Sequence, residues 1–272
     1  MSRKAPSRAG LVVKLGGSVI TDKRGDRPRI RRQVLARLAA ELAQAPKGKL
    51  LAVVHGAGSF GHGPVLRAGI HRGARTAAQR QAWARIQVLQ NELNAEVCRA
   101  LQEAGIPATP CQASAAAVLD DRRLAAFWDD AVRGMVAERL VPVLYGVPAV
   151  DRRQGCAILS GDVLAPELAV RLGAARLVLA TDVDGVYDAD PHRDAAARPF
   201  PRVTPANWDE VEAALGGSRA ADVTGGMRRK LKELLGYVAR HGFQARIVDA
   251  NRPGRLRDAV RGRAVGTLVQ GS

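Results

Sequence analysis

The feature that most constrains the fold is a regular alternation of strand-like and helix-like segments along the 272 residues. Short runs rich in Val, Leu and Ile are separated by amphipathic segments of ten or more residues. This alternation is typical of a parallel sheet whose crossover helices cover both of its faces. We therefore expect an α/β protein, a three-layer αβα sandwich around a mostly parallel open sheet.

The pattern predicts seven strands and five helices. Strands are expected at residues 11–16, 49–56, 106–111, 140–146 and 244–250, within 264–270, and at the start of 176–190, which reads as a strand and a turn. Helices are expected at residues 29–45, 76–105, about 126–139, 162–174 and 225–242. In a sheet of this kind ligands bind beyond the carboxyl ends of the strands, so the residues that follow each strand are the most informative.

Composition narrows the class of protein. No apolar run approaches the roughly 18 residues of a membrane helix, and no signal peptide is recognisable, so we expect a cytoplasmic protein without a membrane partner. The three cysteines show no CxxC pair and are expected to be small buried residues. The net charge of +16 suggests an anionic partner. Nucleic acid is disfavoured because the basic residues are scattered and aromatic residues make up only 4%.

Two glycine-rich stretches follow the first two strands. In "KLGGSVITDK" the glycines leave backbone amides open to an anion, and Lys14 and Lys23 flank the turn. In "VHGAGSFGHG" the glycines at 56, 58 and 61 expose further amides, and His62 is placed to donate to a phosphate oxygen. A tight turn with surface lysines, or a capped loop histidine, would explain either stretch taken alone. His55, at a strand end, is expected to be packed and hydrogen-bonded.

Three later stretches also follow strands. In "LSGDVLAP", Ser160 or Asp162 can cap a helix, and Asp162 can also hold two lysines between which it lies. In "ATDVDGVYDADP", three carboxylates end a strand and suit a plain turn, a ribose or Mg²⁺. In "DVTGGMRRK", paired glycines open a helix with Lys230 on its first turns.

Together the stretches favour phosphoryl transfer. Only seven of the 42 basic residues are lysines, yet Lys14, Lys23 and Lys230 all fall in these segments. A compact ammonium on a flexible stem suits a phosphoryl group in transit. No Ser or Cys nucleophile with a His and acid partner is evident, so direct in-line transfer is expected.

These motifs resemble the amino-acid kinase superfamily, and within it isopentenyl phosphate kinases. The resemblance rests on "KLGGS", "VHGAGSFGH", "SGD", "TDVDGVYDADP" and "DVTGGM..K" and runs from about Leu11 to Val269. It implies ATP and Mg²⁺ as cofactors, an isoprenoid monophosphate as substrate, and a homodimer. It also implies that residues 11–175 form a lobe that binds the acceptor, and residues 176–270 a lobe that binds ATP, on one continuous sheet.

The resemblance also assigns roles to residues. The residues implied in catalysis are Lys14, Lys23, His62, Asp162 and Lys230. Those implied at ATP are Gly16, Gly17, Ser18, Thr181, Asp182, Asp184, Gly185, Tyr187, Gly225 and Lys230. Those implied at the acceptor are Gly56, Ala57, Gly58, Gly61, His62 and Gly161, with Trp83 and Ile86 along its isoprenoid tail. No residue is assigned as a metal ligand.

Departures from the family pattern concern the acceptor. Ala57 stands where a glycine is usual, which requires a negative φ at this residue. Gly63 is an additional residue after His62, as in fosfomycin kinases, and Val147 stands where Asp is frequent. A fosfomycin-type phosphonate kinase and a kinase of another small phosphate monoester therefore remain alternatives. A nucleotide- or nucleic-acid-binding protein with a kinase fold is the non-enzymatic alternative.

Overall fold

The computed structural model describes residues 10–22, 27–189, 191, 194, 196–216 and 223–272. Its main sheet has eight strands in the order β14-β16-β15-β11-β1-β4-β8-β5. All neighbouring pairs are parallel except β15 with β16. The strands are β1 (Leu11–Leu15), β4 (Leu50–His55), β5 (Ala108–Pro110), β8 (Val141–Tyr145), β11 (Arg176–Thr181), β14 (Arg202–Val203), β15 (Gln244–Asp249) and β16 (Thr267–Val269).

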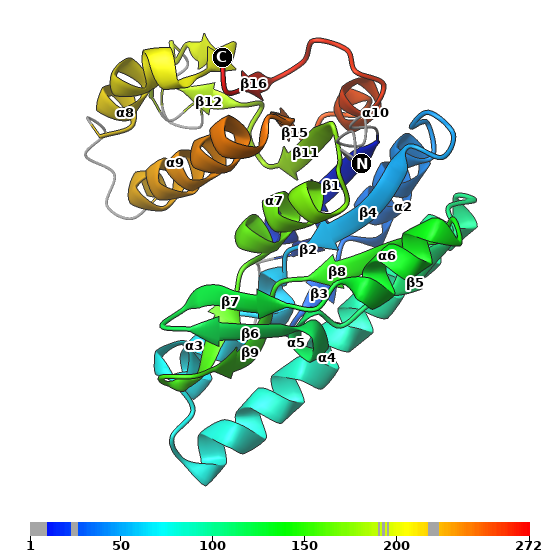
Figure 1. The fold of residues 1–272 in the computed structure, drawn as a ribbon, viewed down its shortest axis with the longest axis vertical. Coiled ribbons are helices and arrows are strands. Elements are labelled where there is room, and N and C mark those ends of the chain that lie inside the picture. Colours follow the sequence, from blue (N-terminus) through cyan, green and yellow to red (C-terminus); the bar gives the residue numbers. More distant parts are fainter. Residues whose placement is uncertain (1–9, 23–26, 190, 192–193, 195, 217–222) are drawn as a thin grey trace, which may run out of the picture.

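Helices cover both faces of this sheet, which confirms the predicted three layers (Figure 1). Strand β1 shows why: Leu11, Val13 and Leu15 enter one apolar cluster, and Val12 enters the other. The first cluster includes side chains of α2 (Arg32–Leu42), α4 (Ala77–Glu103) and α10 (Arg255–Val260). The second includes side chains of α6 (Asp130–Ala137), α7 (Gly161–Arg171), α8 (Trp208–Gly216) and α9 (Val223–His241).

The predicted helices and strands are present with shifted ends, but a second sheet was missed. It has four strands in the order β10-β9-β6-β7, which are β6 (Ala117–Asp120), β7 (Arg123–Phe127), β9 (Val147–Asp151) and β10 (Gly155–Leu159). The predicted start of a helix near residue 126 was wrong, because β7 continues to Phe127. Helices α8 and α10 were also not predicted.

Shorter elements complete the described chain. They are α1 (Gly17–Ile20), β2 (Thr21–Asp22), β3 (Arg29–Ile30), α3 (His62–Ala68), α5 (Ala113–Ala116), β12 (Val186–Tyr187), β13 (Pro199–Phe200) and the 3₁₀ turns η1 (Gly58–Phe60), η2 (Ile70–Arg72) and η3 (Pro205–Asn207). The first predicted helix was expected to start at residue 29, which was wrong, since Arg29 and Ile30 pair with β2 and the helix, α2, begins at Arg32. Among the described residues, no helix has the length and apolar character that a membrane crossing requires.

Candidate active site

The glycine-rich segments after β1 and β4 lie side by side at the carboxyl end of the sheet. Leu15 is in register with His55 on one side and with Ala180 on the other, so the three strands end together. The two segments are in close contact: a Cβ atom on Gly17 would lie 2.3 Å from the amide nitrogen of Gly58. Only glycine permits this approach, which explains why bare backbone follows both strands.

Both segments present unused backbone donors. In the described structure, no backbone carbonyl accepts a hydrogen bond from the amides of Gly17, Ser18, Ala57 or Gly58. Amides that are unpaired in this way need an acceptor, and an oxyanion is the acceptor that suits several together. Ala57 has a φ of −73°, so the residue that departs from the family pattern is accommodated without strain.

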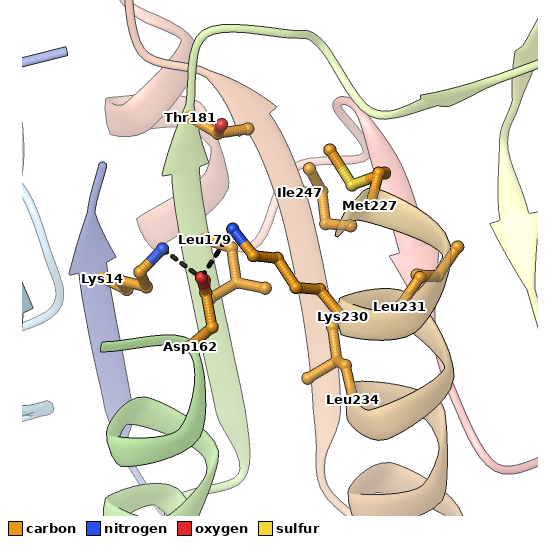
Figure 2. Close-up of a pocket in the computed structure, with 9 residues that line it drawn as sticks. All are labelled: Lys14, Asp162, Leu179, Thr181, Met227, Lys230, Leu231, Leu234 and Ile247. Carbon is orange, nitrogen blue, oxygen red and sulfur yellow. Dashed lines mark hydrogen bonds and ion pairs between the residues drawn. The ribbon is translucent and has the colours of Figure 1, made fainter. Parts of the chain in front are cut away.

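Lys14, Asp162 and Lys230 meet beside these segments, from three different elements (Figure 2). The ammonium of Lys14 on β1 lies 2.5 Å from one oxygen of Asp162, and that of Lys230 on α9 lies 3.0 Å from the other. Burial by itself would raise the pKa of Asp162, but the charges of Lys14 and Lys230 outweigh it and hold the pKa well below its usual range. The carboxylate therefore stays ionised and fixes both lysines.

Local structure explains the position of Asp162. The hydroxyl of Ser160 accepts a hydrogen bond of 3.1 Å from the Asp162 amide and so caps α7, as predicted for one of the two candidates. Gly161 is the first residue of α7, and a Cβ there would lie 3.4 Å from Cε of Lys14. The tight start of α7 thus brings the carboxylate to the end of β1.

These three charged residues form one end of a pocket whose remaining wall is largely apolar. The wall was missed by sequence reasoning, except for Thr181, and consists of Leu179, Thr181, Met227, Leu231, Leu234 and Ile247. The helical spacing of Met227, Lys230, Leu231 and Leu234 was the available signal, since it places an apolar stripe beside the lysine. A charged end and an apolar wall suit a ligand that has phosphates at one end and a base at the other.

The carboxylates that follow β11 were predicted to lie along the nucleotide, but in the structure they form contacts with other protein groups. Thr181 donates to Asp182 over 3.0 Å. Asp184 is buried and is held by Arg255, Arg252 and the Asp249 amide. These contacts give Asp184 a structural role, and its contact with a nucleotide stays a prediction.

Gly185 and Tyr187 follow in the same segment. Gly185 has a φ of +123°, and a Cβ there would lie 2.3 Å from the Thr267 hydroxyl. Tyr187 is half-buried in β12, which pairs with β13. Their proximity to a nucleotide also stays a prediction.

The two histidines of the second segment differ. His55 is fully buried, stacks on Tyr145, and has ring nitrogens 3.1 Å from the Gly56 carbonyl and 3.2 Å from the Asn94 amide. Burial lowers its pKa to about 4, so the ring is neutral at pH 7. The packed role predicted for His55 is confirmed. His62 is exposed and is the first residue of α3, directly after Gly61.

Trp83 and Ile86 belong to a separate apolar cluster with Val65, Ile70 and Cys156. The indole of Trp83 donates to the Pro148 carbonyl over 3.3 Å. This cluster lies between α4 and the segments that follow His62, so it adjoins the expected acceptor site. Of the remaining predicted residues, Gly16 caps α1, Gly225 lies in the first turn of α9, and Lys23 lies outside the described residues.

Comparison with known proteins places this geometry in a family. Residues 10–249 match the model of the "Amino acid kinase family". The chain is 38% identical to the isopentenyl phosphate kinase of Methanothermobacter thermautotrophicus, over 96% of this chain and 99% of that one. It is 35% identical to the isopentenyl phosphate kinase of Haloferax volcanii, over 96% and 98% of the two chains.

A solved structure agrees with these relatives. A crystal structure of an isopentenyl phosphate kinase superposes with a TM-score of 0.81 at 33% identity, covering 95% of this chain and 99% of that chain. Kinases of this family use ATP as the phosphoryl donor. The chain belongs to the amino acid kinase family.

Proposed function

We propose that this chain transfers the γ-phosphoryl group of ATP to the phosphate of isopentenyl phosphate, which gives isopentenyl diphosphate. The observation that carries the proposal is the contact between the two glycine segments, with Gly17 pressed against Gly58. Unused amides on both sides of this contact suit two phosphates that must meet. The relatives described above, which are named as isopentenyl phosphate kinases, support the choice of acceptor.

The proposed mechanism is an in-line attack by an oxygen of the acceptor phosphate on the γ-phosphorus. That oxygen is already anionic at neutral pH, so no general base is required. The main barrier is repulsion between two anions, and cations with oriented amides offset it. Lys14 and Lys230 supply charge on the donor side, with Lys23 as a further predicted contributor, and His62 supplies a donor on the acceptor side. Asp162 keeps the two lysines in place.

Mg²⁺ is part of the proposal as the ion that accompanies the phosphates of ATP. No group of three His, Cys, Asp or Glu side chains gathers at one point among the described residues. Asp162, the one carboxylate among the described residues that line the pocket, is already bonded to two lysines. The ion would reduce the negative charge of the phosphates, while the protein contributes cations and amides.

The remaining roles follow from the same proposal. Residues 11–175 would hold the acceptor, with Trp83 and Ile86 along the isoprenoid tail, and residues 176–270 would hold the nucleoside of ATP. We also propose that the enzyme is a cytoplasmic homodimer.

The test is ADP release with Mg-ATP against isopentenyl phosphate, dimethylallyl phosphate, fosfomycin, uridylate and glutamate. Selective turnover of the two isoprenoid phosphates is expected. Turnover of fosfomycin alone would overturn the proposal that the acceptor is isopentenyl phosphate, and would leave the proposed in-line mechanism in place. No turnover of any acceptor, together with salt-sensitive binding to nucleic acid, would overturn the proposal as a whole.

A further inference from the structure

Gln90, in the middle of α4, has an amide with no hydrogen-bond partner in the described part of the chain. The residue is only 2% exposed, and its amide oxygen is enclosed without a hydrogen-bond donor among the described residues. No hydrogen bond in the described structure involves its amide nitrogen either. A buried amide without partners is costly, and an apolar side chain of the same size would avoid the cost.

The neighbouring amides on the same helix are all bonded to protein. Gln87 donates to the Pro148 carbonyl over 2.9 Å, Asn91 accepts from Tyr145, and Asn94 lies 3.2 Å from His55. These contacts explain why α4 carries polar side chains on a face that packs against the sheet. They leave Gln90 as the exception within this row of amides.

The amide of Gln90 lies against the second glycine segment. A Cβ atom on Gly61 would come within 2.6 Å of its amide nitrogen, so the glycine leaves room for this group. The hydroxyl of Ser59, in the same segment, is also enclosed, and no described residue forms a hydrogen bond with it. Two unsatisfied polar groups thus border the backbone that is expected to hold the acceptor phosphate.

We propose that the amide nitrogen of Gln90 donates a hydrogen bond to a phosphate oxygen of the acceptor. This inference rests on the proposed function, and it adds a side chain of α4 to the acceptor site. The amide is neutral, so it directs an oxygen without adding to the charge that Lys14 and Lys230 supply. A phosphate monoester and a phosphonate present the same oxygens, so the donor serves either head group.

The experiment compares Gln90→Met and Gln90→Glu with the unaltered enzyme in steady-state kinetics. The control is Gln102→Met, the same change on the same helix, where the amide donates to the Ala108 carbonyl outside the site. Loss of one hydrogen bond to a charged group is expected to raise KM for isopentenyl phosphate about tenfold in Gln90→Met. The KM for ATP should change by less than about twofold, as should all constants of the control. Gln90→Glu should raise the KM for isopentenyl phosphate further, because a carboxylate at this position repels the phosphate.

An unchanged or lower KM for isopentenyl phosphate in Gln90→Met would overturn the inference and would place Gln90 along the tail. Calorimetric titration of isopentenyl phosphate without ATP gives the same comparison independently of turnover. If a variant fails to fold, side-chain amide NMR of the unaltered enzyme is decisive: one buried Gln signal must shift when isopentenyl phosphate is added. If the unaltered enzyme rejects isopentenyl phosphate, the proposed function has failed, and the comparison is made with fosfomycin. Rejection of both acceptors overturns both proposals.

Discussion

At the scale of single residues, Asp162 determines how the positive charge of the site is arranged. Two ammonium groups close enough to share a phosphate would repel each other without a carboxylate between them. Asp162 bonds one lysine with each oxygen and leaves the group with one net positive charge. The lysines are therefore positioned before any phosphate arrives, which reduces the reorganisation needed during transfer.

The depressed pKa of Asp162 predicts how stability depends on pH. A carboxylate whose folded pKa lies below its unfolded value of about 3.9 stabilises the protein above that value, and this contribution is lost as pH falls toward the folded pKa. We expect the unaltered protein to be more stable than Asp162→Asn at pH 7, and the difference to shrink below about pH 4, at up to about 1.4 kcal/mol per pH unit. Urea unfolding of both proteins from pH 7 to pH 3 measures it. A difference that is constant over this range would show that the ion pairs do not set this pKa.

His62 carries the second prediction at this scale. As the donor that the proposal places at the acceptor phosphate, it contributes to transfer and not to ATP binding. His62→Ala is expected to lower kcat/KM for isopentenyl phosphate roughly 100-fold, with the affinity for ATP unchanged. The matched control is His241→Ala, at the other end of α9 from Lys230, which should retain activity. Full turnover in His62→Ala would remove the residue from the acceptor site.

At the scale of elements, the sequence predicted the parallel sheet well and the second sheet not at all. Strand β7 reads Arg-Leu-Ala-Ala-Phe, a composition that favours helix, and it becomes a strand only through pairing with β6. The turn between them lacks glycine. Asp121 and Arg122 both have positive φ, and the buried carboxylate of Asp151 accepts a hydrogen bond of 2.7 Å from the Arg122 amide. A turn held by a residue about thirty positions away leaves no local signal.

The candidate site, like the fold, could be predicted from the sequence only in part. Sequence alone identified Lys14 and Lys230, because lysines are rare in this chain and these two lie in glycine-rich segments. It identified Asp162 because this carboxylate follows a strand and can hold two lysines. It missed the apolar wall formed by residues such as Leu179 and Ile247, because these residues look like ordinary core until the fold places them beside the lysines. The sequence also gave no indication that Arg255 forms an ion pair with Asp184.

The second glycine segment supplies a prediction from backbone geometry. Gly58 has a φ of +50°, and a Cβ there would lie 2.0 Å from the Thr21 hydroxyl, whereas Ala57 has a φ of −73°. Gly58→Ala should therefore destabilise the protein by about 1 to 3 kcal/mol and disrupt acceptor binding. Ala57→Gly should lower the free energy of unfolding by only about 0.4 to 1 kcal/mol, because glycine gives the unfolded chain more conformational freedom, and it should keep activity. Thermal unfolding and KM for isopentenyl phosphate measure both effects. Equal effects of the two changes would contradict this account of the segment.

At the scale of the whole molecule, the two expected lobes share their sheet and both of the apolar clusters that cover it. Strand β1 pairs with β11 over five residues, across the expected boundary near residue 175. One apolar cluster contains Leu164 and Leu168 of α7 together with Leu231 and Leu234 of α9. The hydroxyl of Tyr237 on α9 also donates to Glu167 on α7, over 3.2 Å. The lobes differ in their proposed roles, while their packing is continuous.

This continuity predicts that the chain unfolds as one cooperative unit. Trp83 reports on the proposed acceptor lobe and Trp208 on the proposed ATP lobe, so two variants with Phe at the other tryptophans provide separate probes. Urea transitions followed by the two fluorescence signals should have the same midpoint, because neither half of the shared cluster stays buried without the other. ATP should shift both midpoints together, since a ligand that binds only the folded state stabilises the whole cooperative unit. An earlier transition at Trp208, or an ATP shift confined to it, would show instead that residues 176–270 unfold independently and that the shared sheet couples the lobes only weakly.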